Sequence, residues 1–183
     1  IAEIGIGRTF QNVALFPNLS VLDNVRVGTH ARTSSDIISD SLKLAWVRRG
    51  EAAVNKKVLE ILDYLNLNDV AHTVVSGLPF GTQKIIGFAR ALANEPALLL
   101  LDEPSAGLNR EEREDLARHI LRIKHERGLA MIWVEHDMQM VADLADRLYV
   151  LNFGEHLADG PPGDVLSDPR VIEAYLGRRA GDA

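Results

Sequence analysis

The most concentrated hydrophobic run of the chain is LLLLDEPSAGL, at residues 98–108. Four consecutive leucines predict a strand that is apolar on both faces, as is typical of a parallel sheet buried between helix layers. The run ends in Asp102 and Glu103, and Pro104 then interrupts it because proline has no N–H to donate. The pattern therefore predicts two carboxylates at the carboxyl end of a buried strand, the edge where open α/β sheets bind ligands.

The segment before this run is predicted to be mainly helical. A stripe of apolar residues at helical spacing marks one of its helices: Val54, Val58, Ile61, Leu62 and Leu65. The elements expected here are a short strand at 4–11, a helix that Ser20 and Asp23 begin as a capping box, a polar loop at 29–41, a helix at 51–65 and a helix at about 82–93.

After residue 96 the pattern alternates between strands and helices. We expect strands at 98–101, 130–134 and 148–152, with helices at 111–127 and 138–145 between them. This βαβαβ alternation predicts that the three strands share a parallel sheet. Gly128 is expected to end the first of these helices, a hairpin to follow through Gly154, and a last short helix to run from Asp168 to Gly177.

Composition excludes several classes of protein. The chain has 183 residues, 46% of them hydrophobic and 25% charged, which is ordinary for a globular fold. It contains no cysteine, so disulfides and thiolate metal sites are excluded, and its histidines show no zinc-binding spacing. A net charge of −6 argues against a surface built mainly to bind nucleic acid. No apolar run approaches the roughly 20 residues that a membrane-spanning helix needs.

Three other polar motifs accompany the Asp102–Glu103 pair. Gln11 ends the first expected strand, LPFGTQ at 78–83 precedes a helix, and VEHD at 134–137 places His136 at the sheet edge expected for Asp102 and Glu103. Backbone N–H groups at a helix start can hold a phosphate. Each motif taken alone also fits a plainer interpretation: a surface glutamine, a Pro-Gly helix entry and a loop histidine.

Taken together, the order of these motifs resembles the nucleotide-binding subunit of ATP-binding cassette (ABC) transporters. The resemblance covers nearly the whole chain. It matches Gln11 to the Q-loop, 79–83 to the signature loop, 98–102 to the Walker B strand, 105–109 to the D-loop and His136 to the switch histidine.

Within that family, several stretches are similar to the ATP-binding subunit of branched-chain amino acid importers. They are GIGRTFQNVALFPNLSVLDNV, LDEPSAGLN, VEHDM and DRLYVLNFGEHLADGPPGDVLSDPRVIEAYLG. The fold that this implies is an α/β, P-loop NTPase-like parallel sheet core, incomplete at the N-terminus, with an inserted α-helical subdomain. The implied parts are 1–18 (core with the Q-loop), 19–95 (helical subdomain), 96–160 (core with Walker B, D-loop and switch histidine) and 161–183 (C-terminal helical extension).

The resemblance also implies cofactors and roles for single residues. ATP and Mg²⁺ are the expected cofactors, with Asp102 and Gln11 on the metal, Glu103 polarising the attacking water and His136 bonding the γ-phosphate. Phe80 brings no hydroxyl to that phosphate, which leaves the contact to backbone N–H groups and Gln83. The residues expected to bind nucleotide are Gln11, Gly81, Thr82, Gln83, Ser105 and Asn109. Of these, the signature residues Gly81, Thr82 and Gln83 are expected to act in trans.

The implied partners are transmembrane permease subunits and a second ATP-binding subunit, identical or related, at the cytoplasmic face of the inner membrane; nucleic acid is not expected. No G-x-x-x-x-G-K-[ST] phosphate loop occurs in the sequence. We therefore expect an N-terminally truncated piece that is inactive by itself and binds ATP poorly. Three alternatives stay open: a non-catalytic interaction module of the same fold, an ATPase of another importer such as one for urea or amides, and a soluble ABC protein.

Overall fold

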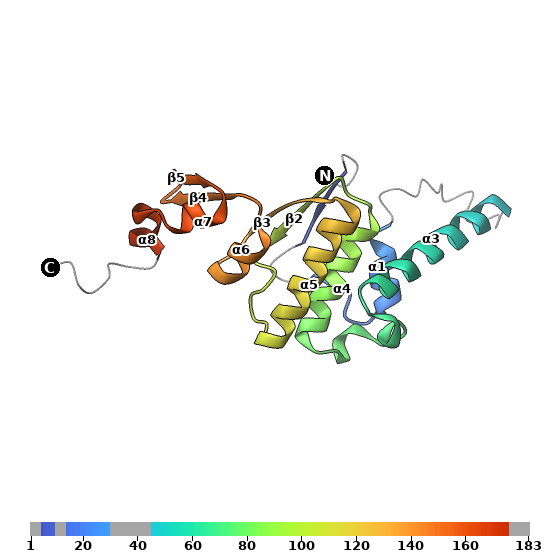
Figure 1. The fold of residues 1–183 in the computed structure, drawn as a ribbon. Coiled ribbons are helices and arrows are strands. Elements are labelled where there is room, and N and C mark those ends of the chain that lie inside the picture. Colours follow the sequence, from blue (N-terminus) through green and yellow to red (C-terminus); the bar gives the residue numbers. More distant parts are fainter. Residues whose placement is uncertain (1–4, 10–13, 30–44, 176–183) are drawn as a thin grey trace. The chain divides into compact units, whose positions relative to one another are not determined.

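The computed structural model describes residues 5–9, 14–29 and 45–175, without the side chains of 45–49 and 51. The chain divides into two compact units, Ile1–Val134 and Glu135–Ala183. The first unit contains β1 (Ile6–Arg8), α1 (Val21–Val27), α3 (Ala45–Tyr64), the 3-10 turns η3 (Asn68–Val70) and η4 (Val75–Gly77), α4 (Phe80–Ala93), β2 (Leu98–Asp102), α5 (Arg110–Arg127) and β3 (Ala130–Val134). These elements are drawn in Figure 1.

The first unit is built on a parallel sheet with the strand order β1-β2-β3. In the register of β2 with β3, Leu98 is paired with Ala130 and Asp102 with Val134. The central strand is therefore the leucine-rich one, and Asp102 is its last residue, at the carboxyl edge. The parallel sheet expected for the first two strands after residue 96 is confirmed.

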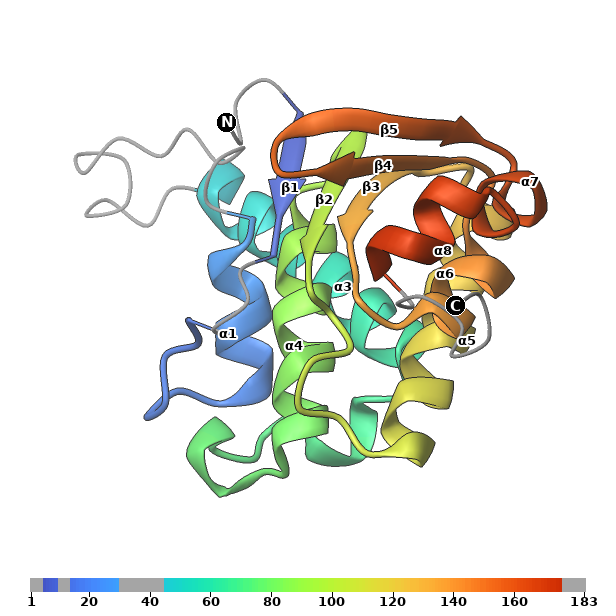
Figure 2. The ribbon, with the colours of Figure 1, turned by 90° about the vertical axis from the view of Figure 1, so that its left-hand side faces the viewer.

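The two faces of this sheet differ in burial. Leu99 and Leu101 on β2 are buried, whereas Ile132 and Val134 on β3 are 59% and 55% exposed. Helices α4 and α5 run along one side of the strands (Figure 2). The helix layer on this side is therefore confirmed, and a second layer on the other face stays a prediction.

The helices follow the predicted apolar stripes closely. In α3, Val58, Ile61 and Leu62 are buried, and so is Leu65 directly after the helix. Ser20 caps α1: its hydroxyl oxygen accepts from the Asp23 N–H at 3.1 Å, and the hydroxyl donates to the Asp23 carboxylate at 2.5 Å. The predicted stripe and the N-cap at Ser20 are thus confirmed, with the Asp23 carboxylate bonded to the Ser20 hydroxyl in place of the backbone bond that a capping box would make.

Helix α5 begins and ends close to its predicted limits. Asn109 and Glu112 form a reciprocal capping box at its start, and Gly128 ends it in the left-handed conformation with φ 58°. Leu116, Ile120 and Ile123 form its buried face. The loop predicted at 29–41 lies outside the described residues except for Thr29.

The second unit contains α6 (Met138–Leu144), β4 (Leu148–Asn152), β5 (Glu155–Gly160), α7 (Pro162–Leu166) and α8 (Pro169–Tyr175). Strands β4 and β5 form an antiparallel pair of their own, so the prediction that residues 148–152 join the parallel sheet is wrong for the described strands. Phe153 and Gly154 both have positive φ, 48° and 82°. Such a two-residue turn pairs a strand with its immediate successor. The hairpin itself was predicted.

The remaining boundaries are settled only in part. Asp168 precedes α8 and accepts from the Arg170 N–H at 2.8 Å, as expected of a cap, whereas Gly177 lies outside the described residues. The division between the two units falls at residues 134 and 135, and the four-part division of the chain stays a prediction. In the described part of the chain, no helix combines the length and apolarity needed to cross a membrane.

Burial in α5 gives one pH-dependent prediction. Desolvation lowers the pKa of His119 below its ordinary value of 6.5, against the opposing charge of Asp115. The unfolded chain therefore binds this proton more readily, and the stabilisation present above about pH 6.5 is lost as pH falls through the lowered folded pKa. We expect the free energy of unfolding to fall less between pH 7.5 and 5 in His119→Gln than in the wild type, measured by urea denaturation. Equal losses in the two proteins would contradict this assignment.

Candidate functional site

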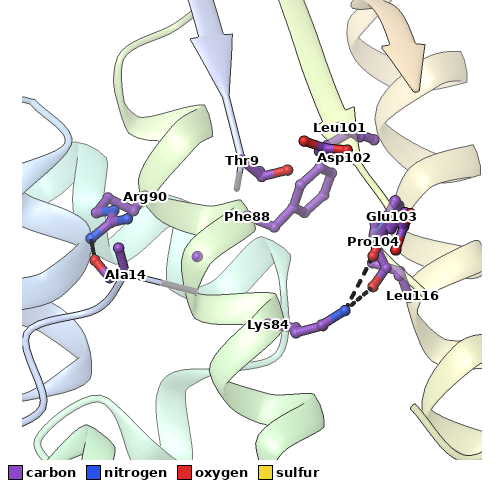
Figure 3. Close-up of a pocket in the computed structure, with 11 residues that line it drawn as sticks. Thr9, Ala14, Lys84, Phe88, Arg90, Leu101, Asp102, Glu103, Pro104 and Leu116 are labelled. Carbon is purple, nitrogen blue, oxygen red and sulfur yellow. Dashed lines mark hydrogen bonds between the residues drawn. The ribbon is translucent and has the colours of Figure 1, made fainter. Parts of the chain in front are cut away.

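A pocket lies beside the carboxyl end of β2 (Figure 3). Its wall comes from β2, the residue after β1, helix α4 and helix α5. The polar and charged residues that line it are Thr9, Lys84, Arg90, Asp102 and Glu103. Apolar side chains such as Phe88, Leu101 and Leu116 form the rest of its wall. The predicted position of the two carboxylates at the sheet edge is therefore also the position of a pocket.

Asp102 is the acidic group on the sheet itself. Its side chain is 40% exposed, and its carboxylate lies 3.4 Å from the Arg8 guanidinium on the neighbouring strand. A hard oxygen donor of this kind suits Mg²⁺, which proteins commonly bind through one or two carboxylates together with phosphate oxygens and water. Within the described ranges, no group of three or more His, Cys, Asp or Glu residues could hold a metal alone. The donor set thus fits a metal that is shared with a phosphate ligand.

Glu103 leaves the strand in an unusual backbone conformation. Its φ is +46°, and its N–H donates to the Val134 carbonyl at 2.9 Å. A non-glycine residue in the left-handed region costs about 1–2 kcal/mol. Adjacent strand residues point to opposite faces, and this change of φ breaks the alternation directly after Asp102. Strain of this kind is concentrated at functional sites.

Lys84 fastens the loop that follows Glu103. Its side chain is buried, and its Nζ donates to the carbonyls of Glu103 at 3.2 Å, Pro104 at 3.0 Å and Ala106 at 2.5 Å; the first two bonds are drawn in Figure 3. Sequence analysis missed Lys84 because a lysine in a mostly apolar helix gives no sign of its partners some 20 positions away. Arg8 was missed for the same reason.

The predicted signature loop is the first turn of α4, which begins two residues earlier than expected. Gln83 donates its side-chain NH₂ to the Leu78 carbonyl at 2.9 Å. Gly81 is buried, and a Cβ at that position would lie 2.3 Å from Glu112 Oε1. Thr82 belongs to the same turn and is partly buried. The structure therefore gives Gly81 and Gln83 local packing roles, and their contact with a nucleotide stays a prediction.

The predicted D-loop residues also have local structural roles. Ser105 is buried within the turns that follow Glu103. Asn109 caps α5, where its Oδ1 accepts from the Glu112 N–H at 3.0 Å. The D-loop and the first turn of α4 meet, because a Cβ on Gly107 would lie 3.0 Å from Cε1 of Phe80.

The described structure does not define where two of the predicted site residues lie relative to this pocket. Gln11 lies outside the described residues. His136 belongs to the second unit, where its backbone N–H donates to the Glu135 carboxylate at 3.1 Å. Their roles beside Asp102 and Glu103 stay predictions.

Comparison with known proteins agrees with this fold. The family model described as ABC transporter matches residues 2–106, and one described as branched-chain amino acid ATP-binding cassette transporter matches residues 155–181. The high-affinity branched-chain amino acid transport ATP-binding protein LivG of Escherichia coli strain K12 is 36% identical over 177 residues, which cover 97% of this chain and 69% of LivG. The chain belongs to the ATP-binding cassettes of ABC transporters.

Solved structures support the same assignment. An ATP-binding cassette of an ABC transporter in its ADP conformation is similar with a TM-score of 0.78 and 29% identity, over 97% of this chain and 70% of that one. A dimeric bacterial ABC transporter cassette is similar with a TM-score of 0.68 and 26% identity, over 87% and 64% of the two chains. The expected fold class, an ABC-type α/β cassette with a parallel sheet core, is confirmed.

Proposed function

We propose that the protein is the ATP-hydrolysing subunit of an importer for branched-chain amino acids. The observation that carries the proposal is the match of residues 155–181 to the branched-chain amino acid cassette model, because this segment lies outside the general ABC match at 2–106. The identity with LivG over 97% of the chain supports the same solute class. An importer of urea or amides is the nearest alternative.

The proposed chemistry uses the two carboxylates in different ways. Asp102, together with Gln11, would hold Mg²⁺, which when bound neutralises negative charge on the ATP phosphates. Glu103 accepts a proton from the water that attacks the γ-phosphate, or orients that water. His136 donates a hydrogen bond to the same phosphate. The position of Asp102 and Glu103 beside one pocket supports this division of roles.

Further nucleotide contacts are proposed across a dimer of two cassettes. Gly81, Thr82 and Gln83 would approach the nucleotide held by the opposite subunit, with Ser105 close by. Asn109 would take part through its side-chain NH₂ group, since its Oδ1 accepts from Glu112. The dimeric form of a similar cassette supports this arrangement. The second cassette is either a copy of this chain or a related subunit.

The proposed site of action is the cytoplasmic face of the membrane, where the cassette would bind the permease subunits peripherally. In this proposal, residues 19–95 form the helical subdomain that contacts the permease. The ATPase core consists of residues 1–18 and 96–160, and residues 161–183 form a C-terminal extension. The 183 residues contain no phosphate-loop motif, so ATP hydrolysis is measured on the protein expressed from its whole reading frame with its partner subunits.

Solute uptake tests the proposal. Deleting the reading frame should abolish high-affinity uptake of radiolabelled leucine, isoleucine and valine, and the wild-type gene should restore it while Asp102→Asn should not. Loss of urea uptake with normal leucine uptake would favour the amide importer instead. Unchanged uptake of every solute would contradict a transport function and favour a soluble ABC protein or a non-catalytic module.

A further inference from the structure

The ammonium group of Lys84 lies where three backbone carbonyls converge. Nζ donates to the oxygens of Glu103, Pro104 and Ala106 at 3.2, 3.0 and 2.5 Å. A lysine ammonium has three N–H donors, so the three carbonyls match its full capacity. The residue is only 8% exposed, and a charge that is buried to this extent needs such partners. Lys84 therefore fixes the path of the loop from Glu103 to Ala106.

The same bonds hold the backbone of Glu103 from both sides. Its N–H donates to Val134 on β3, and its carbonyl accepts from Lys84 on α4. Between these two bonds the residue has a φ of +46°, which an ordinary residue adopts only when its surroundings enforce it. The same carbonyl also accepts from the Ala106 N–H at 3.2 Å within the loop. Loss of the Lys84 bond would therefore remove the tie between Glu103 and α4 and let this backbone relax.

The first turn of α4 packs on the same loop through other contacts. The Phe80 ring lies against Gly107, and the Lys84 ammonium is 5.4 Å from the centroid of that ring. Gly81 lies against Glu112 at the start of α5. Phe80 and Lys84 thus join α4 to the loop after β2, and of these two side chains Lys84 is the one that bonds the backbone of Glu103.

We propose that Lys84 is a positioning residue for ATP hydrolysis: it holds Glu103 in the strained backbone conformation from which its carboxylate reaches the attacking water, and ties that position to the first turn of α4. The inference rests on the proposed function of Glu103 and assigns to Lys84 no contact with nucleotide. Since misplacement of a reacting group by about 1 Å can cost 10²-fold in rate, the effect should appear in kcat and leave ATP binding unchanged.

The test compares Lys84→Met with Lys57→Met. Methionine keeps most of the length of lysine without donors, so the three carbonyls lose their bonds to the ammonium group. Lys57 is the matched control, a partly exposed lysine 2.7 Å from Glu95 and away from the pocket. Steady-state hydrolysis and the Kd for Mg-ATP are measured at a temperature where both variants are folded by circular dichroism.

We expect kcat of Lys84→Met to fall roughly 10- to 100-fold, with KM and Kd for ATP within about twofold of wild type. Lys57→Met should keep the wild-type kcat.

A merely structural lysine would lower Tm without changing kcat of the folded protein, and that result would overturn the inference. If Lys84→Met does not fold, Lys84→Gln, whose amide keeps two N–H donors, is measured under the same criteria. An inactive wild type would contradict the proposed function itself, whereas an active wild type with a normal variant contradicts only the role of Lys84.

Discussion

Replacing Glu103 by glutamine is expected to lower the rate of ATP hydrolysis at least about 100-fold, because general-base catalysis typically contributes 10²–10⁴-fold. Glutamine keeps the size of the side chain and its ability to accept a hydrogen bond, but it does not take up a proton from water at neutral pH. Binding of Mg-ATP should persist, since Asp102 and the rest of the pocket are unchanged. The variant should therefore accumulate with ATP bound.

The measurement combines steady-state hydrolysis with the amount of ATP retained after gel filtration. Glu111→Gln is the matched control, because Glu111 is an exposed residue in the first turn of α5 that does not line the pocket. It should hydrolyse ATP at the wild-type rate and retain little. Hydrolysis by Glu103→Gln at the rate of this control would remove Glu103 from the role of general base.

Gly28→Ala is expected to cause a large loss of stability in the first unit. A Cβ at this position would lie 2.1 Å from the Arg90 carbonyl oxygen and 3.0 Å from its carbon. These are backbone atoms of α4, so α1 has to move away from the helix on which it packs. Overpacking typically costs 1–3 kcal/mol and occasionally more, and we expect about 3 kcal/mol here because no flexible side chain can give way.

Gly50→Ala is the control for this substitution. Gly50 lies within α3, and a Cβ there would meet no described atom outside its own stretch of helix within 4 Å. Alanine should therefore stabilise the helix by about 0.5–1 kcal/mol. Both free energies of unfolding are measured by urea denaturation. Gly28 has an ordinary φ of −61°, so alanine causes no backbone strain there and any loss of stability comes from the contact with Arg90. If Gly28→Ala does not destabilise the protein, α1 and α4 do not pack this closely.

Gly28→Ala should also disturb the pocket beside Asp102 and Glu103. Arg90 donates from Nη1 to the Ala14 carbonyl at 2.7 Å, and both residues line the pocket (Figure 3). Its guanidinium is half-buried, which lowers its pKa by desolvation. A shift of Arg90 would carry the segment at Ala14 with it, so nucleotide binding should weaken together with stability.

Local patterns explain why much of the first unit could be predicted. The strands at 98–102 and 130–134 and the helix at 110–127 are bounded by strong signals: a proline after the leucine run, an N-cap three residues before a glutamate, and Gly128. Each of these signals lies within a few residues of the helix or strand end that it sets, so the boundary can be predicted from the local sequence. The N-x-x-E pattern at Asn109 was nevertheless assigned to the D-loop alone, although it also specifies the capping box that the structure contains.

The features that could not be predicted, the pairing of one strand and the roles of two basic residues, depend on contacts between residues far apart in the sequence. The strand at 148–152 has the same apolar character in a parallel sheet as in a hairpin, and its partner was decided by the Phe153–Gly154 turn. Asp102 and Glu103 were found because they follow one strand. Lys84 and Arg8 were not, because their partners come from other elements and no local pattern of charge or hydropathy marks such a bond.

The most direct test of the account is the magnesium dependence of ATP hydrolysis, measured on the protein expressed from its whole reading frame in complex with its permease subunits. We predict that hydrolysis requires Mg²⁺, that the wild-type complex turns over ATP, and that Asp102→Asn abolishes turnover while the complex still assembles. A complex that assembles normally but neither binds nor hydrolyses Mg-ATP would contradict the account and identify the cassette as a non-catalytic interaction module.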